Sequence, residues 1–500
     1  MSARRLLFSL PYPGHLRYFD SVVAELTRRG WEVELYFEAP DKQPEGIESV
    51  AALPGVTVGG MLPKRRDRFK HAARALRIAV DYVRYLDPGF ADADYLRDRM
   101  GVKLPGRWRV LRRLPQLPSR VVRRLIGAGL VVERALPTAP ELDELVAERR
   151  PSLVLAAPVL MPASRAADLL ESARAAGVPT VGAVSSWDNF TTKGIFRVVP
   201  DRVLVWNEVQ VDEGVDLHLL PRERISITGA QPFDRWFDRR PTRDRAAFAE
   251  RVGLAVDSPY VLFVGSTASI THPDAEIGFV LDWLAQMRAS GGVLADVGVM
   301  VRPHPYNSAH WPDVDLAPFA PAVLWPPSGA NPVNDDDRAD YYDSIAHSAA
   351  VVGINTTAMI ESAIQRKPVF TIALPEFEET QTGTVHFRYL LPENGGFVQV
   401  ASSLDDHLAQ LESALRNPDA AREQVESFLL RFVRPHGLDK PCTPIVADLI
   451  EQTEVQPRVQ DGPVARALAA AALRTVFYGP ARMRTVRSRL ARLSGALRGA

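Results

Sequence analysis

The chain has 500 residues, of which 46% are apolar and 24% are charged. This balance excludes a largely disordered or membrane-spanning protein, and the length predicts at least two globular domains. The single cysteine, Cys442, excludes an internal disulfide framework and a cysteine-rich metal site. No apolar run reaches the ~18 residues of a membrane-spanning helix, and Pro11 and Pro13 interrupt the N-terminus too early for a signal peptide. We therefore expect a cytoplasmic protein.

The net charge is zero, but the charges are unevenly distributed. Residues 64–134 contain 19 Lys or Arg and seven Asp or Glu, an excess of 12 positive charges. Residues 462–500 contain eight Arg and no acidic residue, so the rest of the chain carries an excess of about 20 negative charges. Two basic patches on an acidic body indicate an anionic surface as a partner.

The N-terminal segment predicts a strand, a loop, a helix and a second strand. An apolar strand at 4–10 ends in the loop P-Y-P-G-H, and a helix at 18–29 with one apolar face leads to a strand at 31–37. In such a βαβ unit the loop lies at the carboxyl end of the first strand, where open α/β sheets bind ligands. His15 stands at the helix entry of this loop. A lone histidine is more often a packing residue, but this position makes it a candidate site residue.

Residues 61–137 interrupt the α/β alternation with a basic stretch that we interpret as an insertion of amphipathic helices. Two interpretations of its surface remain open: a solvated charged face, and an interfacial surface that inserts apolar side chains while Arg side chains meet anionic head groups. Because no recognised nucleic-acid-binding module is visible, we expect no nucleic-acid partner. The apolar residues interleaved with the arginines are Trp108, Val110, Leu111, Leu114, Val121, Val122, Leu125 and Ile126.

Strands and helices alternate again from Pro151 to a Pro- and Arg-rich connection at 239–245. That connection predicts the end of a first domain covering residues 1–238. The polar loop 185–194, S-S-W-D-N-F-T-T-K-G, follows a strand and carries Asp188. The predicted strands of this stretch are 152–157, 179–184, 201–206 and 225–228, with a helix at 163–176.

The second half, residues 246–432, repeats the alternation and predicts a second β/α domain. Two such domains imply a cleft between sheets whose carboxyl ends face each other, and ligands of such folds bind there. The predicted strands are 260–264, 297–301, 322–325, 351–354, 369–373 and 397–400, with helices at 276–288, 341–349 and 405–416 and a polar loop at 334–338.

Two loops at strand ends of the second half carry residues that suit phosphate binding. Ser266 and Thr267 belong to a Gly/Ser/Thr loop after the first strand of this half. Arg302 and His304 belong to the sequence R-P-H-P after the next strand. The prolines on both sides of His304 fix its ring, and Arg302 offers a two-pronged donor to a phosphate.

The turn Asn355-Thr356-Thr357 follows another buried strand and precedes a helix at 358–366. Thr356 or Thr357 can cap that helix, with Glu361 near its first turn. Such a turn directs unpaired backbone N–H groups and the positive end of the helix dipole at one point in space. An ordinary strand–turn–helix unit has the same pattern, but a phosphate is the ligand that suits this geometry.

The acidic run Asp335-Asp336-Asp337 is interpreted as a solvated loop or a helix cap, because no D-x-D element sits at a strand end. We therefore expect metal-independent chemistry. Residues 433–500 are predicted to form a basic tail, and its last amphipathic helix favours a position on a membrane surface without spanning it. The apolar stripe of that helix is Met483, Val486, Leu490, Leu493 and Leu497.

Together these motifs resemble the GT-B glycosyltransferases, two-domain enzymes that use nucleotide-activated sugars. The P-x-P-G-H of residues 11–15 and the R-G-W-E-V of residues 29–33 resemble the N-terminal signature of this fold. The I-T-G-A of residues 227–230 resembles the segment that closes its first domain, and the turn 355–357 with Glu361 resembles its donor-binding motif. The sequence R-P-H-P resembles the R-x-H-P element of the capsule-polysaccharide and CDP-glycerol glycerophosphotransferase branch.

The resemblance implies two Rossmann-like domains facing across a cleft, and transfer of a sugar from a nucleotide diphosphate sugar to a hydroxyl of a glycan or lipid-linked acceptor of the cell envelope. In several families of this fold the histidine of the first loop deprotonates the acceptor, which points to His15, and Asp188 is the second candidate base. The chain departs from the donor motif at Lys367, where glycine is commoner. No cofactor beyond the nucleotide sugar is implied. The implied donor-binding residues are Ser266, Thr267, Arg302, His304, Asn355, Thr356, Thr357 and Glu361.

Three other functions remain open on the same residues. A CDP-glycerol-type glycerophosphotransferase would use the same phosphate site but would release a nucleoside monophosphate. A UDP-N-acetylglucosamine 2-epimerase shares the fold and needs no acceptor. A non-catalytic nucleotide-sugar-binding protein or membrane scaffold would bind the donor without turnover.

Overall fold

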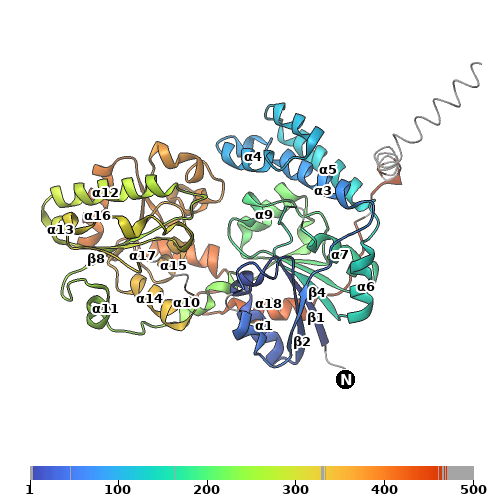
Figure 1. Ribbon diagram of the computed structural model, residues 1–500, viewed down its shortest axis with the longest axis horizontal. Coiled ribbons are helices and arrows are strands. Elements are labelled where there is room, and N and C mark those ends of the chain that lie inside the picture. Colours follow the sequence, from blue (N-terminus) through green and yellow to red (C-terminus); the bar gives the residue numbers. More distant parts are fainter. Residues whose placement is uncertain are drawn as a thin grey trace, which may run out of the picture.

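Two parallel β-sheets stand side by side and form two domains (Figure 1). The first sheet has seven strands and the second has six, which confirms the predicted α/β fold with two Rossmann-like domains. The computed structural model describes residues 4–44, 47–162, 164–327, 332, 334–459, 461–463, 465, 467 and 469.

The first sheet contains β1 (Arg4–Leu10), β2 (Trp31–Phe37), β3 (Val56–Met61), β4 (Leu153–Ala156), β5 (Thr180–Ala183), β6 (Arg202–Val205) and β7 (Ile225–Ile227). All neighbours are parallel, in the order β3-β2-β1-β4-β5-β6-β7. The central strands are runs of apolar residues buried on both faces, as expected where helices cover both sides of a parallel sheet. The strand order reverses between β1 and β4, and this reversal leaves a crevice at the carboxyl edge of the sheet.

The second sheet contains β8 (Tyr260–Val264), β9 (Gly298–Arg302), β10 (Ala322–Leu324), β11 (Ala350–Gly353), β12 (Val369–Ile372) and β13 (Gln399–Ala401). Its order is β10-β9-β8-β11-β12-β13, so the reversal lies between β8 and β11. The loops that carry Thr267 and Thr356 follow these two strands and therefore flank the crevice of this sheet.

The helices of the first domain are α1 (Asp20–Arg28), α2 (Ile47–Ala51), α6 (Pro140–Arg149), α7 (Ala166–Ala175), α8 (Asn189–Thr192), α9 (Glu208–His218) and α10 (Asp234–Asp238). Those of the second domain are α11 (Arg245–Val252), α12 (Pro273–Ala289), α13 (Gly292–Asp296), α14 (Asp335–Ala346), α15 (Ala358–Ile364), α16 (Leu404–Arg416) and α17 (Arg422–Phe428). The polar loop predicted at 334–338 is wrong, because the acidic run forms the first turn of α14. Asn334 caps this helix by accepting the N–H of Asp337 at 2.8 Å, and acidic residues suit the N-terminal end of the helix dipole.

Between β3 and α6 a helical unit covers one end of the first domain, at the top of Figure 1. Its main helices are α3 (Lys70–Arg84), α4 (Asp94–Gly101) and α5 (Ser119–Arg134), and they enclose an apolar cluster of their own. Part of its positive charge is internal. Arg77 pairs with Glu133 and Asp168, and the buried Arg84 donates to the backbone oxygen of Phe190 at 2.6 Å. A solvated charged face therefore does not describe these two arginines.

The apolar side chains of this unit are divided between its core and its surface. Val122 and Ile126 are buried, whereas Val102 and Val110 are 66% and 57% exposed. Among the described residues, no helix is both long enough and apolar enough to cross a membrane. The amphipathic helix predicted around residues 483–497 lies outside the described residues.

After the second domain the chain returns to the first. Helix α18 (Cys442–Glu451) packs beside α1, and its Val446 and Ile450 join the core of the first domain. The buried Arg434 donates to Asp234 at 2.8 Å and so ties this segment to α10. The two domains are thus joined twice, by the connection before α11 and by the segment that leads into α18.

Candidate active site

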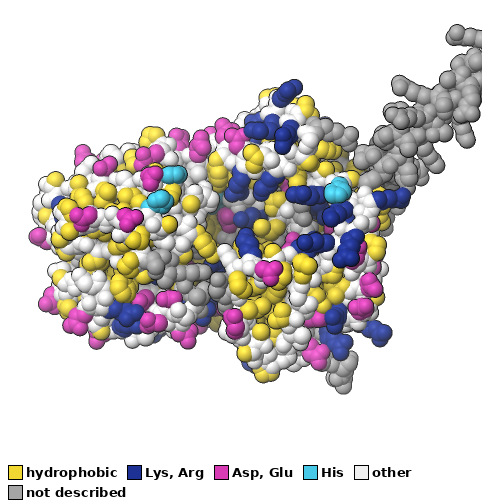
Figure 2. Space-filling model, viewed as in Figure 1, with side chains coloured by type: hydrophobic (Ala, Val, Ile, Leu, Met, Phe, Trp, Pro, Cys, Tyr) yellow, Lys and Arg dark blue, Asp and Glu magenta, His cyan; other side chains and the backbone are white. Residues whose placement is uncertain are grey.

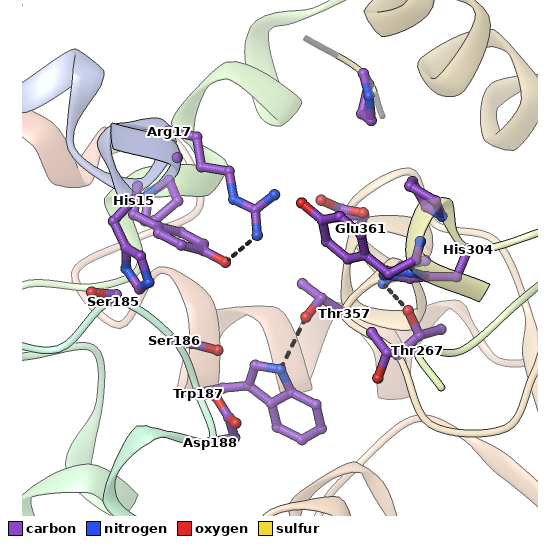
Figure 3. A pocket seen from close by; sticks show the side chains of 18 of the residues that line it. His15, Arg17, Ser185, Ser186, Trp187, Asp188, Thr267, His304, Thr357 and Glu361 are labelled. Atoms are coloured by element: carbon purple, nitrogen blue, oxygen red, sulfur yellow. Dashed lines mark hydrogen bonds between the residues drawn. The ribbon is translucent and has the colours of Figure 1, made fainter. Parts of the chain in front are cut away.

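A cavity of about 540 Å³ opens between the carboxyl ends of the two sheets. The loops after β1 and β5 form its first-domain wall, and the loops after β8, β9 and β11 form its second-domain wall (Figure 3). Nine of the ten predicted site residues line it: His15, Asp188, Thr267, Arg302, His304, Asn355, Thr356, Thr357 and Glu361. The tenth, Ser266, is fully buried behind the wall.

His15 lies in the short helical turn after β1, where the ring of Tyr12 meets it edge-on at 4.4 Å. The pKa of His15 is lowered to about 3, first by burial and then by the charges of the nearby cations Arg17, Lys193 and Lys42. The imidazole is therefore neutral at pH 7. Its Nδ1 is buried and has no hydrogen-bond partner among the described residues.

Arg17 is a cavity residue that the sequence analysis did not select. It follows His15 by two positions, donates to the Tyr18 hydroxyl at 2.7 Å, and extends its guanidinium into the space between the two walls (Figure 3). Its charge acts on both walls: after burial, it is the first cause that lowers the pKa of His15 and also that of His304. An anion in the centre of the cavity would meet this guanidinium.

Asp188 lies in the loop after β5, on the same wall as His15. Its carboxylate accepts the hydroxyl hydrogen of Thr192 at 2.9 Å. Burial would raise the pKa of Asp188, but the charges of Lys193 and His386, with hydrogen bonds from Ser186 and Thr192, bring it below its usual range. Asp188 is therefore charged and held in place, which makes it a weaker proton acceptor than a neutral histidine.

The second-domain wall is built around Arg302, the last residue of β9. Its side chain is 6% exposed and lies over the ring of Tyr341, 4.9 Å from the ring centre. The Nη1 nitrogen is buried and has no hydrogen-bond partner among the described residues. Burial lowers the pKa of Arg302, because the charged guanidinium lacks its water shell. A buried cation whose Nη1 has no hydrogen-bond partner in the described part of the chain, at the edge of a cavity, suits an anionic ligand.

His304 follows Arg302 and is fixed by its own backbone. Its Nδ1 accepts the N–H of Tyr306 at 3.1 Å, so the proton of the neutral ring is on Nε2. Burial and the charge of Arg17 lower the pKa of His304 to about 4. The ring is therefore a neutral donor beside the buried guanidinium of Arg302.

The turn after β11 contributes hydroxyl groups to the same wall. Thr356 accepts the N–H of Ala358 at 3.4 Å, and Thr357 accepts the indole N–H of Trp187 at 3.3 Å. The second bond crosses the cavity from one domain to the other (Figure 3). Asn355 is turned away from this role, because its amide donates to the backbone oxygen of Thr380 at 2.7 Å.

Ser266 holds two loops together and does not face the cavity. Its hydroxyl donates to the backbone oxygen of Asn355 at 3.2 Å, and its N–H donates to Glu276 at 2.7 Å. The loop after β8 is thereby fixed to the turn after β11. Sequence position alone could not separate Ser266 from its neighbour Thr267, which does line the cavity.

Glu361 lies on α15 and reaches the cavity beside Tyr341, whose hydroxyl donates to it. Burial raises the pKa of Glu361. Tyr341 and Trp187 were not predicted as site residues, although Trp187 directly precedes Asp188 in the polar loop 185–194. Within the described ranges, no three His, Cys, Asp or Glu side chains lie close enough together to hold a metal ion. Metal-independent chemistry stays a prediction.

No protein-family model matches the sequence, and no curated protein sequence does either. Solved structures do match. A Listeria monocytogenes protein assigned as a UDP-N-acetylglucosamine 2-epimerase is 10% identical, with a TM-score of 0.50, 92% of this chain covered and 100% of that one. A second UDP-N-acetylglucosamine 2-epimerase is 13% identical, with the same TM-score and the same coverage. A glycosyltransferase from Rickettsia africae is 10% identical over 91% of this chain and 99% of its own, with a TM-score of 0.49.

The chain has the GT-B fold. The two-sheet architecture and the matches at a TM-score of 0.50 confirm the resemblance predicted from the motifs at the level of the fold. Sequence identities of 10% and 13% carry no reaction from these proteins to this one. In this GT-B chain the cavity lies between the domains, where the fold places its ligands.

Proposed function

We propose that the chain is a glycosyltransferase that moves a sugar from a nucleotide diphosphate sugar to a hydroxyl acceptor. One observation carries the proposal: the buried Arg302, whose Nη1 has no partner among the described residues, and the neutral His15 line opposite walls of the same cavity. Arg302 is suited to stabilising an anionic leaving group, and His15 is suited to accepting a proton. The cavity volume of about 540 Å³ is in the range of sites for small molecules.

The donor diphosphate would lie against the second-domain wall. Arg302 would contact its oxygens, His304 would donate through Nε2, and the hydroxyls of Thr267 and Thr356 would complete the site. Arg17 would approach the same group from the opposite wall. Fixed donors in a site with little water stabilise the negative charge that develops on the diphosphate as the sugar leaves.

His15 would take the proton of the acceptor hydroxyl. The acceptor oxygen forms a bond to the anomeric carbon, the bond from that carbon to the diphosphate breaks, and the diphosphate leaves with the electron pair. A pKa of about 3 makes His15 a weak base in the free protein. A bound diphosphate offsets the charge of Arg17 and so raises this pKa towards the range of an effective base.

We propose a cell-envelope glycan or a lipid-linked acceptor, with the protein at the inner face of the cytoplasmic membrane. The support is the positive charge of the helical unit together with exposed apolar residues on its surface, of which Val102 and Val110 are 66% and 57% exposed. The protein should sediment with vesicles that contain phosphatidylglycerol and not with vesicles of phosphatidylcholine alone. Equal sedimentation with both would contradict this assignment.

The reaction is tested by release of nucleoside diphosphate in the presence of EDTA. A thermal-shift panel of nucleoside diphosphates first identifies the nucleotide, because a ligand that binds the folded state raises its stability. We expect turnover of the matching nucleotide sugar in EDTA, and its loss in His15→Ala and in Arg302→Ala. Arg416→Ala, a surface change far along α16, should keep full turnover. If both site variants keep full turnover, the proposal is wrong.

An epimerase is the second candidate, since two fold neighbours are described as UDP-N-acetylglucosamine 2-epimerases. Such an enzyme changes the donor sugar with no acceptor present. Conversion of UDP-N-acetylglucosamine to its 2-epimer without acceptor would favour it, whereas release of a nucleoside monophosphate from CDP-glycerol would favour a glycerophosphotransferase. Binding without turnover of any donor would leave only a nucleotide-sugar-binding protein.

A further inference from the structure

A second group of cations lies on the first-domain side of the cavity, where the helical unit meets the loop after β5. Arg99 of α4 and Lys193 of that loop both line the cavity. Arg99 is held in place, because its Nη2 donates to the backbone oxygen of Thr192 at 2.6 Å. Because Thr192 immediately precedes Lys193 in the chain, this hydrogen bond places Arg99 beside the backbone of Lys193.

Arg99 and Lys193 are therefore two like charges on the same stretch of cavity wall. Both also act on the buried His386: burial lowers its pKa to about 4, Asp188 raises it, and Lys193 and Arg99 lower it. Like charges gathered at a cavity wall raise the free energy of the empty site, and an anion between them removes that cost.

The nearby carboxylates do not neutralise this group. Asp81 is buried in an ion pair with Arg197. Asp188 accepts a hydrogen bond from Thr192 and provides one negative charge against two positive ones. Among the described residues, no carboxylate oxygen lies within 4.0 Å of the charged nitrogens of Arg99 or Lys193.

The position of the group separates it from the donor phosphate site. Arg302 and His304 belong to the second-domain wall, whereas Lys193 acts on His15 and on Asp188, the two candidate bases of the first-domain wall. An anion held by Lys193 would therefore lie on the acceptor side, near the hydroxyl that loses its proton. Figure 2 shows Lys and Arg side chains gathered over the first domain and its helical unit, and Asp and Glu side chains over the second domain.

We infer that Arg99 and Lys193 form a second anion site, and that the acceptor carries an anionic group of phosphate or carboxylate chemistry near its reacting hydroxyl. The acceptor part of this inference rests on the proposed function. The helical unit then has a role in specificity, since it supplies Arg99 to the site. A neutral acceptor of the same shape would leave the two cations without a counter-charge.

Binding of inorganic phosphate to the full chain tests this site. The starting variant is Arg302→Met, because it removes the buried cation of the donor site. Arg17 remains in the cavity of this variant, so the comparison with Lys193→Met decides whether phosphate binds at the second site. We expect phosphate to raise the unfolding temperature of this variant in a saturable manner, above a sodium chloride control of equal ionic strength. Adding Lys193→Met should raise the half-saturating phosphate concentration by about tenfold or more, as expected for loss of one charge-assisted contact.

Two further variants in the same background make the result specific. Lys193→Arg keeps the cation and should restore the response to phosphate. Lys70→Met removes an exposed positive charge from the same helical unit, away from the cavity, and should leave the response unchanged. Repeating the titration with acetate distinguishes the two anion classes, because the anion that acts at the lower concentration is the one the site prefers.

The inference is overturned if neither phosphate nor acetate stabilises the Arg302→Met variant beyond the chloride control. It is also overturned if Lys193→Met and Lys70→Met respond alike. These outcomes do not decide the proposed function, which is tested by nucleotide binding and turnover in the chain with Arg302 intact.

Discussion

The two walls of the cavity carry their positive charge in opposite ways. Residues 1–238 contain 35 Lys or Arg and 30 Asp or Glu, whereas residues 246–432 contain 10 and 24. The second domain is therefore strongly acidic, and yet it carries the buried Arg302 whose Nη1 has no partner among the described residues. A single desolvated guanidinium at a strand end can thus offer a place for an anion on a domain whose net charge is negative.

The first-domain wall carries cations that are not buried, among them Arg17, Arg99 and Lys193. Solvent therefore weakens the interaction of each cation with a ligand. Together they create a positive field at the entrance that raises the rate of encounter with an anion. We therefore expect the first wall to attract anionic ligands and the second wall to hold the donor phosphate tightly.

The largest expected effect separates proton transfer from binding. His15→Gln should lower kcat by about 10²- to 10⁴-fold, as expected for loss of a general base, while nucleoside diphosphate affinity stays unchanged. The pH profile adds a signature: the acid limb of kcat should lie at higher pH than that of kcat/KM. The free-protein pKa of His15 is about 3, and a bound donor raises it, so protonation inactivates the bound form first as pH falls. If Asp188→Asn shows this loss of kcat and His15→Gln shows little loss, the base is Asp188 instead.

Arg302→Met is the sharpest test of the second wall, because binding and stability should move in opposite directions. Loss of the buried guanidinium should weaken nucleoside diphosphate binding by about 2–4 kcal/mol, or roughly 30- to 1000-fold in Kd. The ligand-free protein should become more stable, since a buried charge whose Nη1 lacks a partner among the described residues is replaced by an apolar side chain. Calorimetric titration and thermal unfolding measure the two effects, with Arg416→Met as the surface control. A variant that binds normally would remove Arg302 from the donor site.

His407→Leu distinguishes a core histidine from the cavity histidines. His407 is fully buried on α16 between Trp283 and Phe370, and neither ring nitrogen has a hydrogen-bond partner among the described residues. Burial lowers its pKa to about 4, so the folded state excludes a proton that the unfolded chain takes up below pH ~6.5. Its contribution to stability is therefore lost as pH falls from about 6.5 to 4, by at most roughly 3 kcal/mol.

The expected result for His407→Leu is a higher unfolding temperature at pH 7.5 and a larger gain at pH 4.5, with catalysis at neutral pH unchanged. His310 is exposed, and His310→Ala serves as the control: it should change neither the unfolding temperature nor catalysis. A gain that does not grow towards acid pH would contradict the assignment of a buried neutral ring.

The smallest expected effect tests the bond that joins the two walls. Trp187→Phe removes the indole N–H that Thr357 accepts, which should weaken donor binding by about 0.5–1.5 kcal/mol. Thr357→Val removes the other partner. A double-mutant cycle on nucleoside diphosphate affinity should give a coupling energy of about 1 kcal/mol, whereas additive losses would mean that the bond does not contribute to closure of the cavity.

Much of the fold was predictable from local patterns. The strands at 31–37 and 260–264 were predicted with the bounds that the structure has. The first begins with alternating apolar and acidic residues and ends in an apolar run, and the second is apolar throughout. The edge strand β3 was missed, since V-T-V-G-G-M contains two glycines and is largely exposed. The start of α14 was also misplaced, because an acidic run after Asn334 has the composition of a loop until its cap is recognised.

The sequence alone was sufficient to predict the loops that carry His15, Arg302, His304 and Thr356, since chemistry-bearing residues directly after a buried strand must lie at the carboxyl edge of a sheet. It could not predict that Arg17 extends into the space between the two walls or that Ser266 is turned into the interior. Those features depend on which strands become neighbours and on how closely the two sheets approach. Such long-range placement arises from packing between distant segments, and no local pattern of residues encodes it.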